Sequence, residues 1–355
     1  MKKVKIYVLL MVFAMVLSLL VGCSQPNATP AAQEPKPDVS APTTDAGNTG
    51  GEQKAWKVLL TPKITGIPYV NRCEIGANWA AEDYGMEVIF AGPQSADAVE
   101  QVRMIEDYLS QGLDGIAVMS SDPAVYTPVL QKARDNGIAT IDWVSPVEPE
   151  VVDYSVASVD AMEFAELHVT ELVKYMGDSG EYALILGNFN DVEQNNWFNL
   201  IEEIMERDYP NIVLVTERIP TDEKAEVAYQ KTIELIQAYP NLTGIIATAT
   251  PNLPGVGQAI RDKGLQDKIV ALGDTTPDSI SEYLKSGDVK SAMLWDPAVL
   301  AYTTVYTLKC LLEGNPVEDG TVLDRIGTPM IVNGKEIIPC KPVVFTPENV
   351  DSFGF

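Results

Sequence analysis

The strongest constraint on the fold is an alternation of short apolar runs with segments of helical period. Lys57–Thr61 has the length and composition of a buried strand, while Val99, Val102, Ile105 and Leu109 recur at the steps that give a helix one apolar face. The same reasoning predicts strands at 57–61, 86–90, 115–119, 138–141, 182–186, 212–215, 244–248, 269–272 and 289–294. Between them it predicts helices around 75–84, 99–109, 123–136, 162–174, 193–207, 223–239 and 253–263. Such alternation is typical of parallel sheets that carry helices on both faces.

The pattern begins again after Pro146, so we predict an α/β fold with two doubly wound parallel-sheet lobes in series. About 300 residues follow position 54, which suits two domains of ordinary size. Ligands of open parallel sheets bind beyond the carboxyl ends of the strands. Two facing lobes would share one such cleft, so the candidate ligand-binding residues are those that follow each strand.

Polar and aromatic side chains occupy these strand-end positions. They are Lys63, Tyr69, Asn71, Asp142, Trp143, Glu193, Gln194, Asn195, Thr250, Asp274, Trp295 and Asp296. Carboxylates and amides pair with hydroxyl groups, and aromatic rings cover the apolar face of a sugar ring. We therefore expect a small sugar as the ligand.

Each of these residues also has a purely structural alternative. Trp143 and Trp295 suit core positions as well as a ligand platform. Asp274 could cap a helix, Asp296 could bond backbone in a hinge, and Lys63 could be a solvated loop charge. The prediction rests on their coincidence at successive strand ends.

The first residues of the chain have the pattern of an export signal. Lys2, Lys3 and Lys5 precede an apolar run, and Leu20-Val21-Gly22-Cys23 has the form of a bacterial lipobox. We expect a lipoprotein signal peptide at 1–22 and a lipid on Cys23, which would hold the exported protein on the outer face of the cell membrane. Residues 23–54 have almost no large aliphatic side chains and are expected to form a disordered linker.

The net charge and the cysteine spacing exclude some classes of partner and ligand. The formal net charge of -25 disfavours nucleic acid and anionic lipid. Beyond Cys23, the three cysteines Cys73, Cys310 and Cys340 match no zinc spacing. They are compatible with one disulfide and a free thiol, or with three buried thiols.

An enzyme is the first alternative function. Glu193 and Asp274 could serve as the carboxylate pair of a secreted glycosidase. However, the one histidine, His168, lies in the expected helix 162–174, where we place it on a solvated face. No Gly-x-Ser-x-Gly elbow or phosphate-binding loop is present. We therefore expect no catalysis, no cofactor and no metal.

At these residues the chain resembles the periplasmic-binding-protein family of sugar type (type I fold). It resembles most the autoinducer-2-binding and rhamnose-binding branch of ABC-transporter substrate-binding lipoproteins. The matching stretches are 62–66, 91–93, 111–116, 121–123, 193–197, 294–297 and 347–350. In that branch a lysine follows the first strand, as Lys63 does, and an acid–glutamine pair precedes Asn-x-Trp, as Glu193-Gln194 does.

The resemblance implies two lobes joined by a three-stranded hinge with the ligand cleft between them. The N-terminal lobe is expected at 55–145 plus 298–320 and the C-terminal lobe at 146–297 plus 321–355, with crossings near Ser145, Trp295 and residue 320. It further implies a monomeric receptor that closes on a rhamnose-type monosaccharide or autoinducer-2 and docks on ABC permease subunits. A receptor for quorum-sensing or chemotaxis signalling remains the alternative, and the lipobox argues against a transcription regulator of the same fold.

Overall fold

The computed structural model describes residues 55–355. The expected signal peptide at 1–22, the lipid site Cys23 and the linker at 23–54 lie outside the described residues. Residues 53–355 form a compact unit of their own, which contains two sheets of seven strands each.

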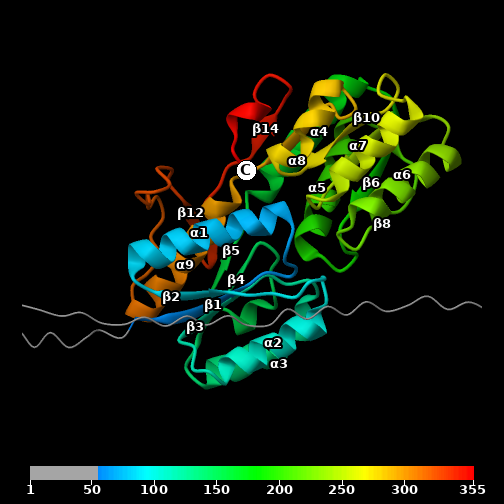
Figure 1. Ribbon diagram of the computed structural model, residues 1–355. Coiled ribbons are helices and arrows are strands. Elements are labelled where there is room, and N and C mark those ends of the chain that lie inside the picture. Colours follow the sequence, from blue (N-terminus) through cyan, green and yellow to red (C-terminus); the bar gives the residue numbers. More distant parts are fainter. Residues whose placement is uncertain (1–54) are drawn as a thin grey trace, which may run out of the picture. The chain divides into compact units, whose positions relative to one another are not determined.

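The first sheet has the strand order β12-β13-β5-β4-β3-β1-β2. Its strands are β1 (Lys57–Thr61), β2 (Glu87–Phe90), β3 (Gly115–Val118), β4 (Ala139–Trp143), β5 (Tyr154–Val156), β12 (Ile331–Asn333) and β13 (Glu336–Ile338). Figure 1 shows α1 (Pro68–Tyr84) and α9 (Pro297–Glu313) on one face, with α2 (Ala98–Leu109) and α3 (Pro123–Asp135) on the other. Every residue of β3 is buried, as expected for a strand covered on both faces.

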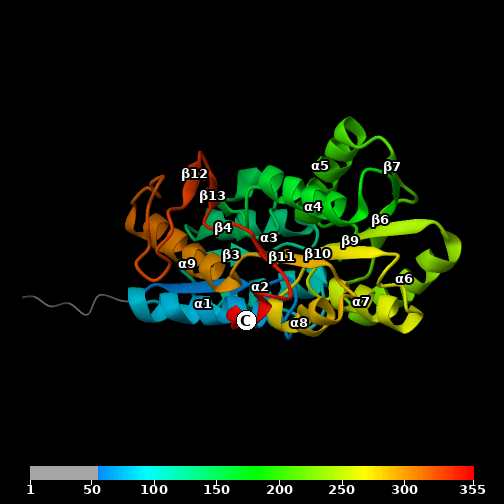
Figure 2. The same cartoon turned by 90° about the horizontal axis from the view of Figure 1, so that it is seen from above.

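The second sheet has the order β14-β11-β10-β9-β6-β7, and β8 pairs separately with β6. Its strands are β6 (Gly180–Leu186), β7 (Ile212–Leu214), β8 (Ile219–Pro220), β9 (Leu242–Ala247), β10 (Val270–Asp274), β11 (Ser291–Leu294) and β14 (Val343–Phe345). Figure 2 shows α4 (Ala161–Met176) and α5 (Val192–Asp208) on one face of this sheet, and α6 (Ala225–Ala238), α7 (Asn252–Lys263) and α8 (Pro277–Ser286) on the other. The predicted pair of doubly wound lobes is therefore confirmed.

The chain passes between the two sheets three times. These connections are residues 157–160 after β5, 295–296 after β11 and 339–342 after β13. The second connection contains Trp295, where a crossing was expected, whereas the first and third lie at 157–160 and 339–342 rather than near Ser145 and residue 320.

The strand pairing differs from the expected lobe boundaries. β5 pairs with β4 and with β13, and β13 pairs with β12, so residues 154–156 and 331–338 belong to the first sheet. Assigning 146–297 and 321–355 wholly to the second lobe is therefore wrong for these strands. Each has three residues, which is too short for hydrophobic periodicity to place it in a sheet.

His168 corrects a second expectation. Its side chain is fully buried in α4, where Nδ1 donates a hydrogen bond of 2.8 Å to the carbonyl oxygen of Phe164. The two rings meet edge to face with centroids 4.5 Å apart. Burial lowers the pKa of His168 to about 4. The histidine is a neutral core residue rather than part of a solvated face.

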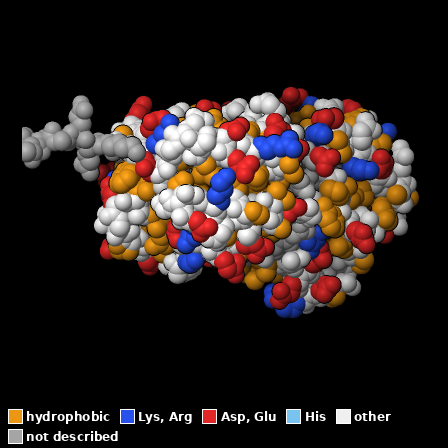
Figure 3. All heavy atoms as spheres, turned by 90° about the horizontal axis from the view of Figure 1, so that it is seen from below, with side chains coloured by type: hydrophobic (Ala, Val, Ile, Leu, Met, Phe, Trp, Pro, Cys, Tyr) orange, Lys and Arg blue, Asp and Glu red, His pale blue; other side chains and the backbone are white. Residues whose placement is uncertain are grey.

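The three cysteines of the described residues form no disulfide. Cys73, Cys310 and Cys340 are free and buried, which matches the second of the two cysteine alternatives. On the face shown in Figure 3, acidic side chains are mixed with Lys, Arg and apolar groups rather than gathered in one patch. Within residues 55–355, no helix combines the length and the apolar character needed to cross a bilayer.

The packing of α1 on α9 depends on Gly76. A Cβ at this position would lie 2.0 Å from the carbonyl oxygen of Ala298, so the two helix backbones approach too closely for any other residue. The neighbouring N-cap of α9 is Asp296, whose side chain accepts a hydrogen bond of 2.9 Å from Ala298 N. The atoms that face Gly76 therefore belong to the backbone of α9, which cannot move aside as a flexible side chain could.

We expect Gly76→Ala to lower the free energy of unfolding by about 1–3 kcal/mol, because α9 must move to relieve the clash. The matched control is Asn78→Ala, which introduces the same residue at an exposed position of the same helix. It should be neutral or slightly stabilising, since alanine favours helices. Urea unfolding of both variants measures the difference, and equal midpoints would contradict the close approach.

Candidate functional site

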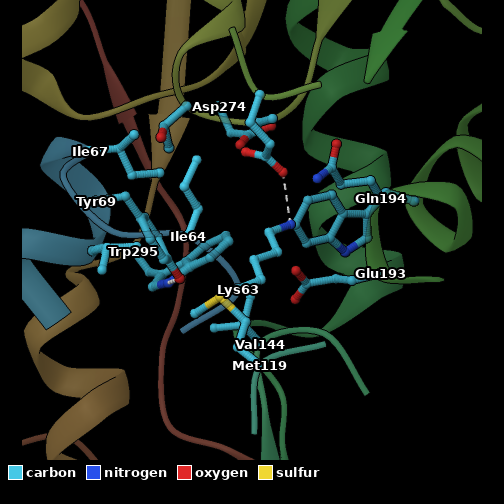
Figure 4. Close-up of a pocket in the computed structure, with 15 residues that line it drawn as sticks. Lys63, Ile64, Ile67, Tyr69, Met119, Val144, Glu193, Gln194, Asp274 and Trp295 are labelled. Atoms are coloured by element: carbon cyan, nitrogen blue, oxygen red, sulfur yellow. Dashed lines mark hydrogen bonds and ion pairs between the residues drawn. The ribbon is translucent and has the colours of Figure 1, made fainter. Parts of the chain in front are cut away.

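A pocket lies between the carboxyl ends of the two sheets (Figure 4). It contains about 440 Å³ of non-atom space, part of which is open to solvent. Its lining comes from loops of both sheets and is formed by Lys63, Ile64, Ile67, Tyr69, Val70, Met119, Val144, Glu193, Gln194, Trp197, Glu223, Ala249, Thr250, Asp274 and Trp295. The lining, mostly apolar and aromatic with a few convergent polar groups, is typical of a small-molecule site.

A buried ammonium group forms the centre of the pocket. Lys63, which follows β1, places Nζ 2.5 Å from Asp191 Oδ2 and 2.9 Å from Glu223 Oε1. Figure 4 shows the Lys63 side chain extended into the pocket, and its ion pair with Glu223 is drawn as a dashed line. Burial alone would lower the pKa of Lys63, but the two carboxylates outweigh it and raise this pKa. The lysine therefore stays charged and links the first lobe to the second.

Asp191 is held in place by the start of α5. Its carboxylate caps the helix by accepting hydrogen bonds of 3.0 Å from Gln194 N and from Gln194 Nε2. Gln194 Oε1 in turn accepts from Gly187 N at 2.8 Å and from Thr248 Oγ1 at 2.9 Å. With its amide oxygen used twice inside the protein, Gln194 positions Asp191 as well as lining the pocket.

Two further carboxyl groups line the pocket without a cation of their own. Glu193 accepts a hydrogen bond of 2.7 Å from Ser158 Oγ. Burial, reinforced by the charge of Asp191, raises the pKa of Glu193 well above its usual value. Burial and then the charge of Glu223 raise the pKa of Asp274 in the same way. In the empty pocket these two groups hold protons more strongly than exposed acids do.

Aromatic rings form the opposite wall. Trp295 Nε1 donates a hydrogen bond of 3.2 Å to the hydroxyl of Tyr69, and the two rings are nearly perpendicular. Trp197 stands 6.0 Å from Trp295, and Phe164 packs behind both rings. The indole N–H of Trp295 is thereby satisfied, and the carbon faces of the rings suit an apolar surface of a ligand.

Unfavourable backbone conformations cluster at this pocket. Val144, Glu223 and Ala249 line it and have positive φ values of 64°, 59° and 66°, and Asp222 beside Glu223 has 55°. Such conformations cost free energy in residues other than glycine, most of all in a β-branched valine. Their concentration here supports a functional role for the pocket.

The structure brings most of the predicted site residues together. The predicted residues that line the pocket are Lys63, Tyr69, Glu193, Gln194, Thr250, Asp274 and Trp295. The strand-end rule places them there because both sheets direct their carboxyl ends toward one space.

The remaining predicted residues lie elsewhere. Trp143 is fully buried in the core beside Phe90, and Asp142 is buried below it, accepting a hydrogen bond of 3.0 Å from Val147 N. Here β4 runs two residues further than expected, to Trp143, so Val144 reaches the pocket instead.

Three more expectations fail for local reasons. Asp296 caps α9 and makes a two-pronged ion pair with Arg72 at 2.8 and 2.7 Å, which is the hinge alternative. Asn195 donates to the carbonyl oxygens of Phe189 and Asp191. Asn71 is exposed on α1.

Some pocket residues were not predicted. Asp191 stands three residues before Gln194, a spacing typical of a helix capping box, and this signal could have identified it. Glu223 follows the two-residue strand β8, and Met119, Trp197 and Ala249 carry no sequence signal that separates them from core. Within residues 55–355, no group of three or more His, Cys, Asp or Glu is placed to hold a metal ion.

We expect Lys63→Met to lower the free energy of unfolding by about 3–5 kcal/mol at neutral pH, because it leaves Asp191 and Glu223 buried without their cation. The control is Lys224→Met at an exposed position, which should change stability by less than about 0.5 kcal/mol. Equal urea midpoints for Lys63→Met and wild type would show that the two acids do not depend on the lysine.

We expect Asp142 to make stability fall with rising pH. Burial raises its pKa to about 7, against the opposing hydrogen bonds from Ser155 and Val147 N. Its pKa in the unfolded chain is about 3.9, so its contribution is complete below about pH 4 and is lost as pH rises through 7.

The side chain of the variant Asp142→Asn cannot ionise. Relative to wild type, the free energy of unfolding of the variant should therefore rise by a few kcal/mol as the pH increases from 4 to 8. Urea unfolding across that pH range measures the difference in unfolding free energy between variant and wild type. Glu193 and Asp274 are present in both proteins, so their contributions to this difference cancel. Asp107→Asn at an exposed position is the control. A difference between Asp142→Asn and wild type that does not vary with pH would contradict the buried position of the carboxyl group.

Solved structures share this architecture. LsrB from Clostridium saccharobutylicum in complex with AI-2 superposes with a TM-score of 0.78 at 24% identity, over 84% of this chain and 100% of that one. A solute-binding protein of an ABC transporter from Clostridium phytofermentas with bound L-rhamnose gives 0.77 at 23% identity, over 84% and 98% of the two chains.

Sequence comparison agrees. The D-apiose import binding protein of Actinobacillus succinogenes is 24% identical over 243 residues, which are 68% of this chain and 77% of that protein. Residues 58–316 match the model of the periplasmic binding protein domain. Since this match covers most of the chain and both sheets, the protein belongs to the periplasmic binding protein family.

Proposed function

We propose that the protein is the lipid-anchored substrate-binding protein of an ABC importer and binds a small sugar or sugar-like ligand between its two lobes. A rhamnose-type monosaccharide and autoinducer-2 are the ligand candidates. The observation that carries the proposal is the pocket itself, in which carboxyl groups of the second lobe line the same space as Lys63 and Tyr69 of the first lobe and the ring of Trp295.

The chemistry of the lining favours a compact polyhydroxy ligand. Glu193 and Asp274 offer oxygen atoms to hydroxyl groups, and Thr250 adds a further hydroxyl at the same pocket. The aromatic wall suits the carbon face of a ring. A site built from buried polar groups also discriminates strongly, since an analogue that lacks one hydroxyl leaves a protein group unpaired.

Closure would complete the site. Lys63 from the first lobe reaches Asp191 and Glu223 of the second, and Asn190 Nδ2 of the second lobe donates to Asp122 Oδ2 of the first at 3.3 Å. A ligand that contacts both walls has more contacts in the closed form and therefore shifts the population toward it. The three connections at 157–160, 295–296 and 339–342 are where the backbone would bend.

The cellular setting rests on the sequence of the first residues. The lipobox ending at Cys23 supports export and anchoring on the outer face of the membrane. Several relatives are named as import binding proteins, such as the ribose import binding protein of Bacillus subtilis, and this supports a role in import with ABC permease subunits as partners. These relatives are named as binding proteins, which favours ligand capture over catalysis.

We expect one ligand class to raise the melting temperature of residues 24–355, a fragment that includes the whole compact unit 53–355. The panel is rhamnose, ribose, arabinose, apiose, galactose and autoinducer-2. A ligand at one hundred times its Kd stabilises by about 2.7 kcal/mol, which a thermal scan detects.

Asp274→Ala and Trp295→Leu should abolish the shift, whereas Asp278→Asn, an exposed acid at the start of α8, should leave it unchanged. Absence of any shift across the panel in a folded sample would count against a sugar-binding role.

A further inference from the structure

The pocket carries more acid than its lysine can balance. Lys63 is already paired with Asp191 and Glu223, at 2.5 and 2.9 Å. Glu193 and Asp274 line the same space, and the charged groups that act on them are Lys63 and other acids. Even with both of these carboxyl groups protonated, two carboxylates face one ammonium, so the pocket is negative before a ligand enters.

Asp274 has a buried carboxyl oxygen without a hydrogen-bond partner, which a ligand could supply. Its side chain is 4% exposed, and Oδ1 accepts no hydrogen bond from any described residue. In the view of Figure 4, Asp274 lies above the ammonium of Lys63 and Glu193 lies below it. A buried carboxyl oxygen without a partner is costly, and the cost is removed when a ligand donates to it.

We propose that the pocket selects a small polyhydroxy ligand that carries a protonated amino group, of the amino-sugar class, and rejects sugars that carry a carboxylate or phosphate. This inference rests on the proposed function, because it names the charge class of ligand within that same site. The ammonium would donate to Asp274 Oδ1, which lacks a hydrogen-bond partner among the described residues. Charge-assisted hydrogen bonds of this kind are about twice as strong as neutral ones.

The proton balance of binding follows from the same geometry. The ionisable groups that face this space are Lys63, Tyr69, Asp191, Glu193, Glu223 and Asp274. Burial makes Glu193 and Asp274 bind protons more strongly than exposed acids do, so an ammonium that donates to Asp274 favours its carboxylate form and releases any proton that it holds. A neutral sugar needs no such release.

The test compares matched ligands that differ at one position of the ring. Glucosamine, glucose and glucuronate form one set, and the galactose and mannose series supply two more. Isothermal titration at pH 7.5 should give the amine at least about 10-fold tighter binding than the neutral sugar of its set, and no binding of the carboxylate. The amine, unlike the neutral sugar, should also show a binding heat that varies with the ionisation enthalpy of the buffer.

Isosteric variants separate charge from shape. Asp274→Asn and Glu193→Gln keep the size of each side chain and remove its charge, so the ratio of amine to neutral-sugar affinity should fall toward one. Asp278→Asn is the control and should leave that ratio unchanged.

Two results would overturn the inference, and they differ in what else they affect. If a neutral sugar binds at least as tightly as its amine, the charge class is wrong while the proposed sugar-binding function stands. If no member of any set binds and the neutral panel also fails, both the inference and the proposed function fail together.

Discussion

The pocket depends on one buried ion pair cluster. The ammonium of Lys63 satisfies Asp191 and Glu223 at once, and each of the three side chains comes from a different stretch of chain. A buried charge without a partner costs several kcal/mol, so none of the three is tolerable alone. The position of each loop is therefore fixed by the other two, and the aromatic wall and the strained backbone are arranged around this cluster.

Much of the architecture could be predicted from hydrophobic patterning. Strand β1 and helices α5 and α7 lie where the periodicity places them, to within a residue or so. The exceptions include whole helices, because α8 and α9 were not predicted and α1 begins at Pro68 rather than near residue 75. Short strands are the other exceptions. β5, β12 and β13 have three residues each, and sheet membership for such strands is decided by pairing with distant residues, which no local pattern records.

A site residue could be predicted from the sequence where its position depends only on following the carboxyl end of a strand. Lys63 and Asp274 follow this rule. It failed at β4, where two extra residues of strand place Asp142 and Trp143 in the core and bring Val144 to the pocket. It also could not find Glu223, whose place depends on a left-handed backbone conformation that sequence does not predict for glutamate.

The three passages of the chain between the sheets have a consequence for biosynthesis. The edge strands β12 and β13 complete the first sheet, yet they are made only when the ribosome reaches residues 331–338, after nearly all of the second sheet. β14 at residues 343–345 then completes the second. Neither lobe can complete its sheet before these residues leave the ribosome, so the two sheets acquire their last strands one directly after the other. A truncated product would therefore leave both sheets with open edges, which favours aggregation.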